Sequence, residues 1–347
     1  MRSHKFLVIL IAVTTLVTVF AVTPAAARPG DNGKICIVNE PGNSPFNVDA
    51  AAGAAEAGKK LNVDVAIGEA ATEADMLANI DAFVTGGDCD LIFGVGFIVA
   101  FAMEPFIANN PEQAFVVLDF SFGGLYPNVA EVVFDSNEAG FLAGYVAAGV
   151  SDTGTIGVFG GLPIPPVTAF MDGYVLGVDR YNAAYGDSVE VLGWDPDLQT
   201  GEFSFTFTEP AVGQTIASDL YDAGADIVFP VAGLTGFGAL EEAALRTAGG
   251  EDVYVIGVDT DWSAQLGDPD RVILTSAIKD FGPGVYNQAA AWVNGTWEGG
   301  EVAEGLAGGS VDIARFRKLN RVVPGTLRND LKALRSGIID GSIPTTP

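Results

Sequence analysis

Histidine is almost absent from this chain of 347 residues, which has only His4. His4 lies in a segment typical of a secretory signal, with a positive start, an apolar run at residues 6–22 and small residues at 25–27. We expect residues 1–27 to be removed, so that the mature chain has no histidine. This excludes a histidine general base, Ser-His-Asp and Cys-His nucleophiles, and histidine metal sites.

Positive charge is also scarce, with 17 Lys and Arg against 44 Asp and Glu. Removal of Arg2 and Lys5 with the signal leaves 15 basic and 44 acidic residues, a net charge of −29. Such a surface repels nucleic acid and anionic lipid, so neither is an expected partner. We expect export to the periplasm or the outer face of the membrane. No later stretch could span a bilayer, and no lipid-anchor cysteine follows the cleavage position.

Only two cysteines are present, Cys36 and Cys89. An even count in an exported chain favours a disulfide. Cys36 lies in an expected strand at 34–38, and Cys89 directly precedes another at 90–94. These strands would be neighbours in a doubly wound sheet, so we predict a Cys36–Cys89 bridge.

Strand and helix patterns alternate along the whole chain, which indicates parallel sheets covered by helices on both faces. The alternation restarts after Asp135, Ser136 and Asn137, where we place a hinge. We predict a signal peptide at 1–27, a first lobe of residues 33–136 plus about 261–300, and a second lobe of residues 137–260 plus about 301–347. Residues 195–206 are irregular and indicate an insertion. A hinged pair of α/β lobes is typical of proteins that close on a ligand.

A glycine-rich turn follows the apolar strand at residues 227–231. Gly233, Gly236 and Gly238 lie between this strand and a helical pattern that begins at Ala239. Ligands bind at this edge of open α/β sheets, where glycines allow close approach to the backbone. The turn has no Lys or Arg, so we expect a neutral ligand with hydroxyl groups rather than a phosphate.

Several segments, taken together and in order, resemble the basic membrane protein (PnrA-like) family of nucleoside-binding receptors of ABC transporters. They are Ser44-Pro-Phe-Asn47, Phe141-Leu-Ala-Gly-Tyr-Val-Ala-Ala148, Thr153-Gly-Thr-Ile-Gly-Val-Phe-Gly-Gly161, Gly224-Ala-Asp-Ile-Val-Phe229, Ala232-Gly-Leu-Thr-Gly-Phe-Gly238, Val255-Ile-Gly-Val-Asp-Thr-Asp261 and Leu274-Thr-Ser-Ala-Ile-Lys279. The resemblance covers nearly the whole mature chain. It implies a type I periplasmic-binding-protein fold, capture of a purine nucleoside, and a permease as partner.

The resemblance also implies a set of ligand-binding residues. Two aromatic rings would sandwich the base, polar groups would read its edge, and carboxylate, backbone and ammonium groups would hold the ribose. In that order they are Phe46 and Phe207, then Asp119 and Asn47, then Asp259, Gly233 and Lys279. Asp261 is an alternative to Asp259, which is favoured because it directly follows the strand.

Two other classes of function remain open. A nucleoside or sugar hydrolase would use paired carboxylates, which Asp119, Asp259 and Asp261 would supply. A sensor module for another small solute is the second alternative. The binding-protein interpretation predicts no catalytic residues and no cofactor. No loop has the spacing of an EF-hand, so no metal site is predicted.

Overall fold

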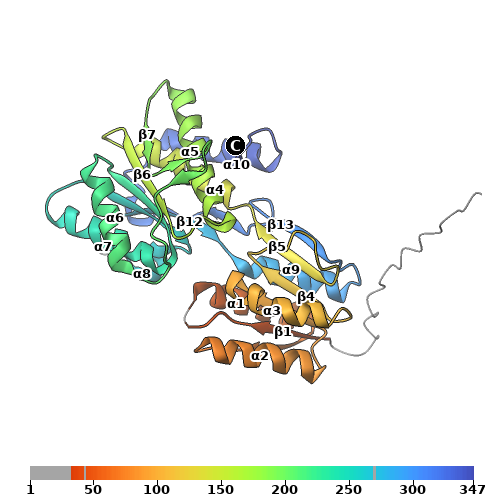
Figure 1. Ribbon diagram of the computed structural model, residues 1–347. Helices are drawn as coiled ribbons and strands as arrows, with labels where there is room; N and C mark the ends of the chain where they lie inside the picture. Colours follow the sequence, from red (N-terminus) through yellow and green to blue (C-terminus); the bar gives the residue numbers. More distant parts are fainter. Residues whose placement is uncertain (1–32, 43, 269–270) are drawn as a thin grey trace, which may run out of the picture.

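The chain folds into two α/β lobes, shown in Figure 1. The computed structural model describes residues 33–42, 44–268 and 271–347. The expected signal peptide, residues 1–27, lies outside the described residues. In the described part of the chain no helix is long and apolar enough to cross a membrane.

The first lobe is built on a parallel six-stranded sheet. Its strands, in spatial order, are β13 (Gly300–Glu304), β5 (Val129–Phe134), β4 (Ala114–Leu118), β3 (Leu91–Val95), β1 (Lys34–Val38) and β2 (Asp64–Gly68). Its helices are α1 (Pro45–Leu61), α2 (Glu73–Gly86), α3 (Gly96–Asn109) and α9 (Phe281–Val293).

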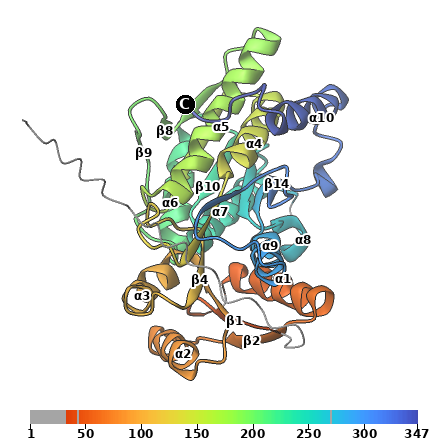
Figure 2. The same ribbon diagram turned by 90° about the vertical axis from the view of Figure 1, so that its right-hand side faces the viewer.

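Alternation along β1 explains why helices cover both faces of this sheet. Ile35 and Ile37 belong to the core under α1 and α9, while Cys36 and Val38 belong to the core under α2 and α3. Figure 2 shows these two helix layers on opposite sides of the strands. A strand buried on both faces reads as a continuous apolar run, which is the pattern the sequence has here.

The second lobe has a six-stranded sheet of similar build. Its strands, in spatial order, are β14 (Val311–Ile313), β12 (Ile273–Lys279), β11 (Tyr254–Asp259), β10 (Ile227–Val231), β6 (Thr155–Gly160) and β7 (Glu190–Leu192). Its helices are α4 (Ser136–Val150), α5 (Pro165–Tyr185), α6 (Pro210–Asp222), α7 (Gly236–Ala248), α8 (Trp262–Leu266) and α10 (Gly325–Ile339). The edge strand β14 is antiparallel to β12. The predicted fold class, two doubly wound lobes of the periplasmic-binding-protein type, is confirmed.

The region expected to be an irregular insertion contains a small hairpin. β8 (Trp194–Asp195) and β9 (Thr200–Gly201) pair antiparallel. Trp194 is buried, and its indole N–H donates to Asp172 at 2.9 Å. The hairpin is therefore anchored to α5, and its turn leaves Leu198 exposed.

The chain passes between the lobes three times, and this corrects the predicted lobe boundaries. β12 pairs with β11, so residues 273–279 belong to the second sheet rather than the first. β13 pairs with β5, so residues 300–304 belong to the first sheet rather than the second. These strands are short, and the sequence of a short strand does not indicate which sheet it joins.

Backbone hydrogen bonds tie the three crossings together. Asp135 N donates to Glu304 O at 3.0 Å, and Asp280 N donates to Ser310 O at 2.8 Å. The Glu304 carboxylate, which is 5% exposed, accepts from Asn287 and from Ser310. The hinge is thus a set of segments joined by hydrogen bonds rather than a free linker.

The predicted disulfide is confirmed, because Cys36 and Cys89 are bonded. Cys36 lies in β1, and Cys89 stands two residues before β3, the strand that pairs with β1. The bridge therefore joins neighbouring strands of the first sheet.

Candidate ligand-binding site between the lobes

A buried lysine meets carboxylates from both lobes. Lys279, the last residue of β12, is 3% exposed. Its Nζ donates to Asp119 Oδ2 at 2.7 Å and lies 3.7 Å from Asp259 Oδ1. Asp119 follows β4 of the first lobe, and Asp259 ends β11 of the second. Lys279 therefore links the two lobes at the carboxyl ends of their strands, the edge where α/β sheets bind ligands.

The backbone at both aspartates explains why this residue type occurs there. Asp119 has φ 65° and Asp259 has φ 66°. Aspartate tolerates this left-handed conformation better than most residues, because its short side chain bonds locally. Each strand thus stops abruptly at an acidic residue, and the two carboxylates reach the same ammonium group.

A third carboxylate, which the sequence analysis missed, joins this group. Glu40 lies two residues after β1, and its carboxylate rests against Gly96, where a Cβ would collide with it. Burial raises the pKa of Glu40 to about 7; Ser44 and Lys279 lower it, while Asp119 and Asp259 raise it. Near neutral pH, this side chain is therefore a donor as well as an acceptor of hydrogen bonds.

The pKa values of the other charged groups in the cluster are also shifted. Burial raises the pKa of Asp259 to about 6, against the opposing effect of Lys279. Burial also raises the pKa of Asp119, again opposed by Lys279. Burial alone would lower the pKa of Lys279, but Asp119 and Asp259 hold it above its usual value. The lysine stays charged, and acidic groups outnumber it in the cluster.

Phe46 forms one end of a stack of three rings. Its ring is 4.3 Å from Phe281 with 5° between the planes, and Phe281 is 4.8 Å from Phe134 with 12° between the planes. Lys279 Nζ lies 5.1 Å from the centre of the Phe46 ring. The stack fixes the plane of Phe46 beside the charged cluster, as an aromatic platform for a base requires.

Phe207 is held on the side of the second lobe. Its ring fills the space beside Gly161, where a Cβ would collide with it, and it also lies against Gly233. Gly233 has φ 54° and begins a short 3-10 helix after β10. The Phe207 ring also approaches Phe97 of the first lobe, with ring centres 6.2 Å apart. Phe97 directly follows Gly96, the residue against which the Glu40 carboxylate rests.

Asn47 holds the loop between β1 and α1. Its Oδ1 accepts from Glu40 N at 2.9 Å, and its Nδ2 donates to Glu40 O at 3.0 Å and to Gly42 O at 3.3 Å. The amide is thus engaged with backbone, and it positions Glu40.

Asp259 and Asp261 have different surroundings. Asp261 Oδ1 accepts from Ala264 N at 2.9 Å and so caps α8, and Asp261 also pairs with Arg317 at 2.6 Å. Asp259 instead faces Lys279. The structure thus brings together Phe46, Asp119, Asp259 and Lys279. Asp261 instead caps the neighbouring helix α8. No group of three or more His, Cys, Asp or Glu among the described residues has the arrangement of a metal site.

The molecule has two lobes, a hinge of three hydrogen-bonded crossings, and a polar and aromatic site between the lobes. These are the features of a solute-binding protein. The comparisons identify the particular family. Residues 34–343 match the family described as ABC transporter substrate-binding protein PnrA-like, and the chain belongs to that family.

Named relatives span most of the chain. It is 29% identical over 312 residues to the ABC transporter nucleoside-binding protein BmpA of Lactococcus lactis subsp. cremoris, covering 86% of this chain and 84% of that protein. It is 30% identical over 302 residues to basic membrane protein A1 of Borrelia garinii subsp. bavariensis, covering 86% and 83%.

Solved structures give the same class of fold. An ABC transporter solute-binding protein of Aeropyrum pernix K1 superposes with a TM-score of 0.73 at 26% identity, covering 89% of this chain and 92% of that one. A glucose-galactose binding protein of Geobacillus stearothermophilus superposes with a TM-score of 0.58 at 16% identity, covering 84% and 99%. At this identity the second likeness shows the fold alone.

Proposed function

We propose that this protein captures a nucleoside between its lobes and delivers it to the permease of an ABC importer. The observation that carries the proposal is the meeting of Lys279, Asp119 and Asp259 from both lobes beside the stacked ring of Phe46. The naming of the Lactococcus lactis relative as nucleoside-binding supports this ligand class. We further propose that the chain is exported, in keeping with its N-terminal sequence.

Each predicted residue has a role in this proposal. Phe46 stacks on one face of the base and Phe207 lies on the other side. Asp119 accepts hydrogen bonds from the edge of the base, while Asn47 acts by holding the loop that carries Glu40. Asp259, Gly233 and Lys279 bind the ribose hydroxyls.

We also propose that the protein does no chemistry on its ligand. Asp119 and Asp259 both face Lys279, so neither has the independent environment that separates an acid from a nucleophile in a glycosidase pair. Incubation with a nucleoside should therefore return it intact, and release of the free base would favour a hydrolase.

Ligand-dependent stability tests the proposed function. A ligand that binds only the native state stabilises it by about 2.7 kcal/mol at a hundredfold excess over Kd. We expect adenosine, guanosine or inosine to raise the melting temperature, and mass spectrometry of protein purified under native conditions to find a nucleoside. A shift with sugars or amino acids but with no nucleoside would contradict the proposal.

Phe46→Ala tests the aromatic platform. Loss of one stacked ring removes about 1–3 kcal/mol of binding, so Kd should rise about 5- to 150-fold in calorimetry. Leu245→Ala is the control, because Leu245 is 62% exposed near the end of α7 and should leave Kd unchanged. An unchanged Kd in Phe46→Ala would return this ring to a purely structural role.

A further inference from the structure

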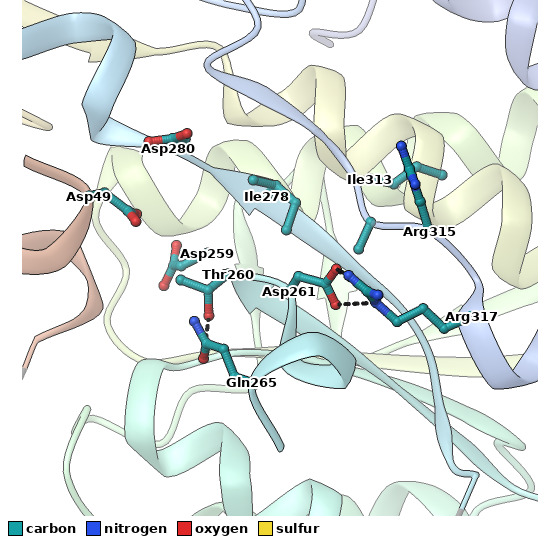
Figure 3. A pocket seen from close by; sticks show the side chains of 11 residues that line it. Asp49, Asp259, Thr260, Asp261, Gln265, Ile278, Asp280, Ile313, Arg315 and Arg317 are labelled. Atoms are coloured by element: carbon teal, nitrogen blue, oxygen red, sulfur yellow. Dashed lines mark hydrogen bonds and ion pairs between the residues drawn. The ribbon is translucent and has the colours of Figure 1, made fainter. Parts of the chain in front are cut away.

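The two lobes face each other with unlike chemistry in different parts of the cleft. Asp259 borders a groove of about 390 Å³, whose lining side chains are shown in Figure 3. Asp49 of the first lobe lies in this groove, and burial together with the charges of Asp280 and Asp259 raises its pKa to about 7. Carboxylates from both lobes therefore repel one another here wherever they are ionised, and this repulsion opposes closure.

Away from that groove, aromatic rings from the two lobes meet. Glu40, a member of the charged cluster, rests against Gly96, and Phe97 comes next in α3. The Phe97 ring of the first lobe and the Phe207 ring of the second have centres 6.2 Å apart, with 55° between their planes. Inclined rings at this distance attract each other. This contact therefore favours closure, and neither ring lines the groove of Figure 3.

Packing within the first lobe does not explain the ring of Phe97. Phe97 is the second residue of α3 and is half-buried. Within the described residues it belongs to neither buried core, nor to the partly buried side chains packed against them. Val99 and Met103 of the same helix do belong to the core under the first sheet. The ring of Phe97 thus contributes to the cleft between the lobes rather than to the core of its own lobe.

The second lobe supports Phe207 mainly with glycine. An added Cβ on Gly161 would collide with the Phe207 ring, and one on Gly233 would lie 3.6 Å from it. The backbone carbonyl of Phe207 accepts from Thr235 N at 3.2 Å. Glycine gives the ring a backbone surface but no side chain beside it. Phe97 of the other lobe supplies an aromatic side chain next to this ring.

We propose that Phe97 is a positioning residue for the nucleoside site, and that its contact with Phe207 holds the cleft closed over the ligand. Phe207 is the ring placed on the second side of the base, so the contact fixes this ring against the base. Opening the lobes separates Phe97 from Phe207, because each belongs to a different lobe. The contact therefore stabilises the closed state and slows ligand release. This inference rests on the proposed function, which assigns Phe207 to the base and no role to Phe97.

Binding kinetics test this role, measured by surface plasmon resonance with adenosine, guanosine and inosine as probes. For the nucleoside that the wild type binds most tightly, Phe97→Ala should raise koff about 3- to 12-fold, the contribution of one aromatic pair. The association rate should change less than about twofold, because the ligand enters while the lobes are open. Phe97→Tyr keeps the ring, so its koff should stay within about twofold of the wild type.

A double-mutant cycle distinguishes this positioning role from a merely structural one. In a Phe207→Ala background, Phe97→Ala should change koff by less than about 1.5-fold, since the partner ring is already gone. Phe97→Leu keeps apolar bulk without a ring, and it provides the same cycle should Phe97→Ala fold poorly. Leu245→Ala, exposed near the end of α7, is the control and should leave koff unchanged in both backgrounds.

The outcomes separate the two proposals. If none of the three nucleosides binds the wild type, the proposed function fails and the role of Phe97 fails with it. If a nucleoside binds but Phe97→Ala leaves koff unchanged, the proposed function stands and the role of Phe97 alone is overturned. Equal increases in koff with and without the Phe207 ring would also overturn this role, because the effect would not require the contact.

Discussion

Glu40, Asp119 and Asp259 compete for one ammonium group, that of Lys279. The pKa of Glu40 is raised from 4.5 to about 7, chiefly by burial, so the folded protein holds this proton more tightly than the unfolded chain does. Between these two values, the unfolded chain gives up its proton first. The stability that a neutral Glu40 contributes is therefore present at low pH and lost as the pH rises through about 7.

Glu40→Gln should remove this dependence. One pKa unit corresponds to about 1.4 kcal/mol, so we expect the variant to gain about 2–3 kcal/mol relative to the wild type between pH 5 and pH 8. Urea unfolding at both pH values measures the difference. Glu241→Gln, an exposed position on α7, should show no such change between the two values. Parallel pH profiles for Glu40→Gln and wild type would mean that Glu40 is ionised in the folded protein.

The sequence predicted the chemistry of individual residues unevenly. Phe46, Asp119, Asp259 and Lys279 stand at strand ends or helix starts that the family resemblance marks, and the structure brings them together. Glu40 was missed because it lies in a loop, and its carboxylate is covered by distant segments that include Gly96 at the start of α3. Burial of a loop carboxylate depends on contacts between distant segments, which no local pattern contains.

Among the elements, α4 and α5 make an unusually close pair. A Cβ on Gly144 of α4 would collide with the backbone carbonyl of Tyr174 on α5, and one on Gly177 of α5 would collide with the carbonyl of Phe141 on α4. Glycines on both helices thus let the two backbones approach directly. Gly144 lies in the family segment at residues 141–148, and this close helix packing explains why a glycine stands there.

Gly144→Ala should therefore destabilise the protein. A backbone carbonyl cannot move aside as a flexible side chain can, so we expect a loss of about 1–3 kcal/mol of unfolding free energy by urea denaturation. Gly86→Ala is the matched control, because this exposed glycine near the end of α2 has no neighbour within 3.4 Å of an added Cβ. Equal stability of the two variants would show that α4 and α5 can separate at no cost.

The disulfide adds a second constraint between elements. Cys36 and Cys89 are 53 residues apart, and the bond joins β1 to the start of β3. Closing a loop of this length restricts the unfolded chain, so Cys36→Ala with Cys89→Ala should cost about 2–4 kcal/mol of stability.

Urea unfolding of the oxidised wild type against the double variant measures this loss. Titration of the native wild type should find no free thiol. Two reactive thiols in the native protein, or an unchanged urea midpoint in the variant, would contradict the prediction.

Strand identity was more predictable from sequence than strand partnership. The apolar runs at β1, β3, β4 and β10 are continuous because both faces of each strand are buried. β12 and β13 are also strands, but their placement in the two sheets was reversed in the predicted boundaries. Which sheet a returning strand joins depends on the course of the chain through the hinge, and the pattern of the strand itself does not record it.

At the scale of the whole molecule, charge is the dominant feature. The full chain has a net charge of −27, and its acidic residues are scattered along the sequence. Like charges repel one another in the compact state more than in the expanded chain. Added salt screens this repulsion, since the Debye length falls from about 10 Å at 0.1 M to about 3 Å at 1 M.

We therefore expect the urea midpoint at pH 7.5 to rise when potassium chloride is increased from 0.1 M to 1 M. The gain should come mostly at the lower concentrations, where screening changes fastest. Potassium and sodium chloride should act alike if screening is the cause. A midpoint that stays constant, or that rises with only one of these salts, would exclude general charge repulsion as the reason.

The three crossings between the lobes have a consequence for the way the chain acquires its structure. The first sheet receives β13 only at residues 300–304, after nearly the whole second lobe has been made. A chain that emerges from its N-terminus cannot complete the first lobe early and then add the second. The two lobes must instead mature together near the end of synthesis, and a chain that stops before Gly300 would leave β5 as an open strand edge.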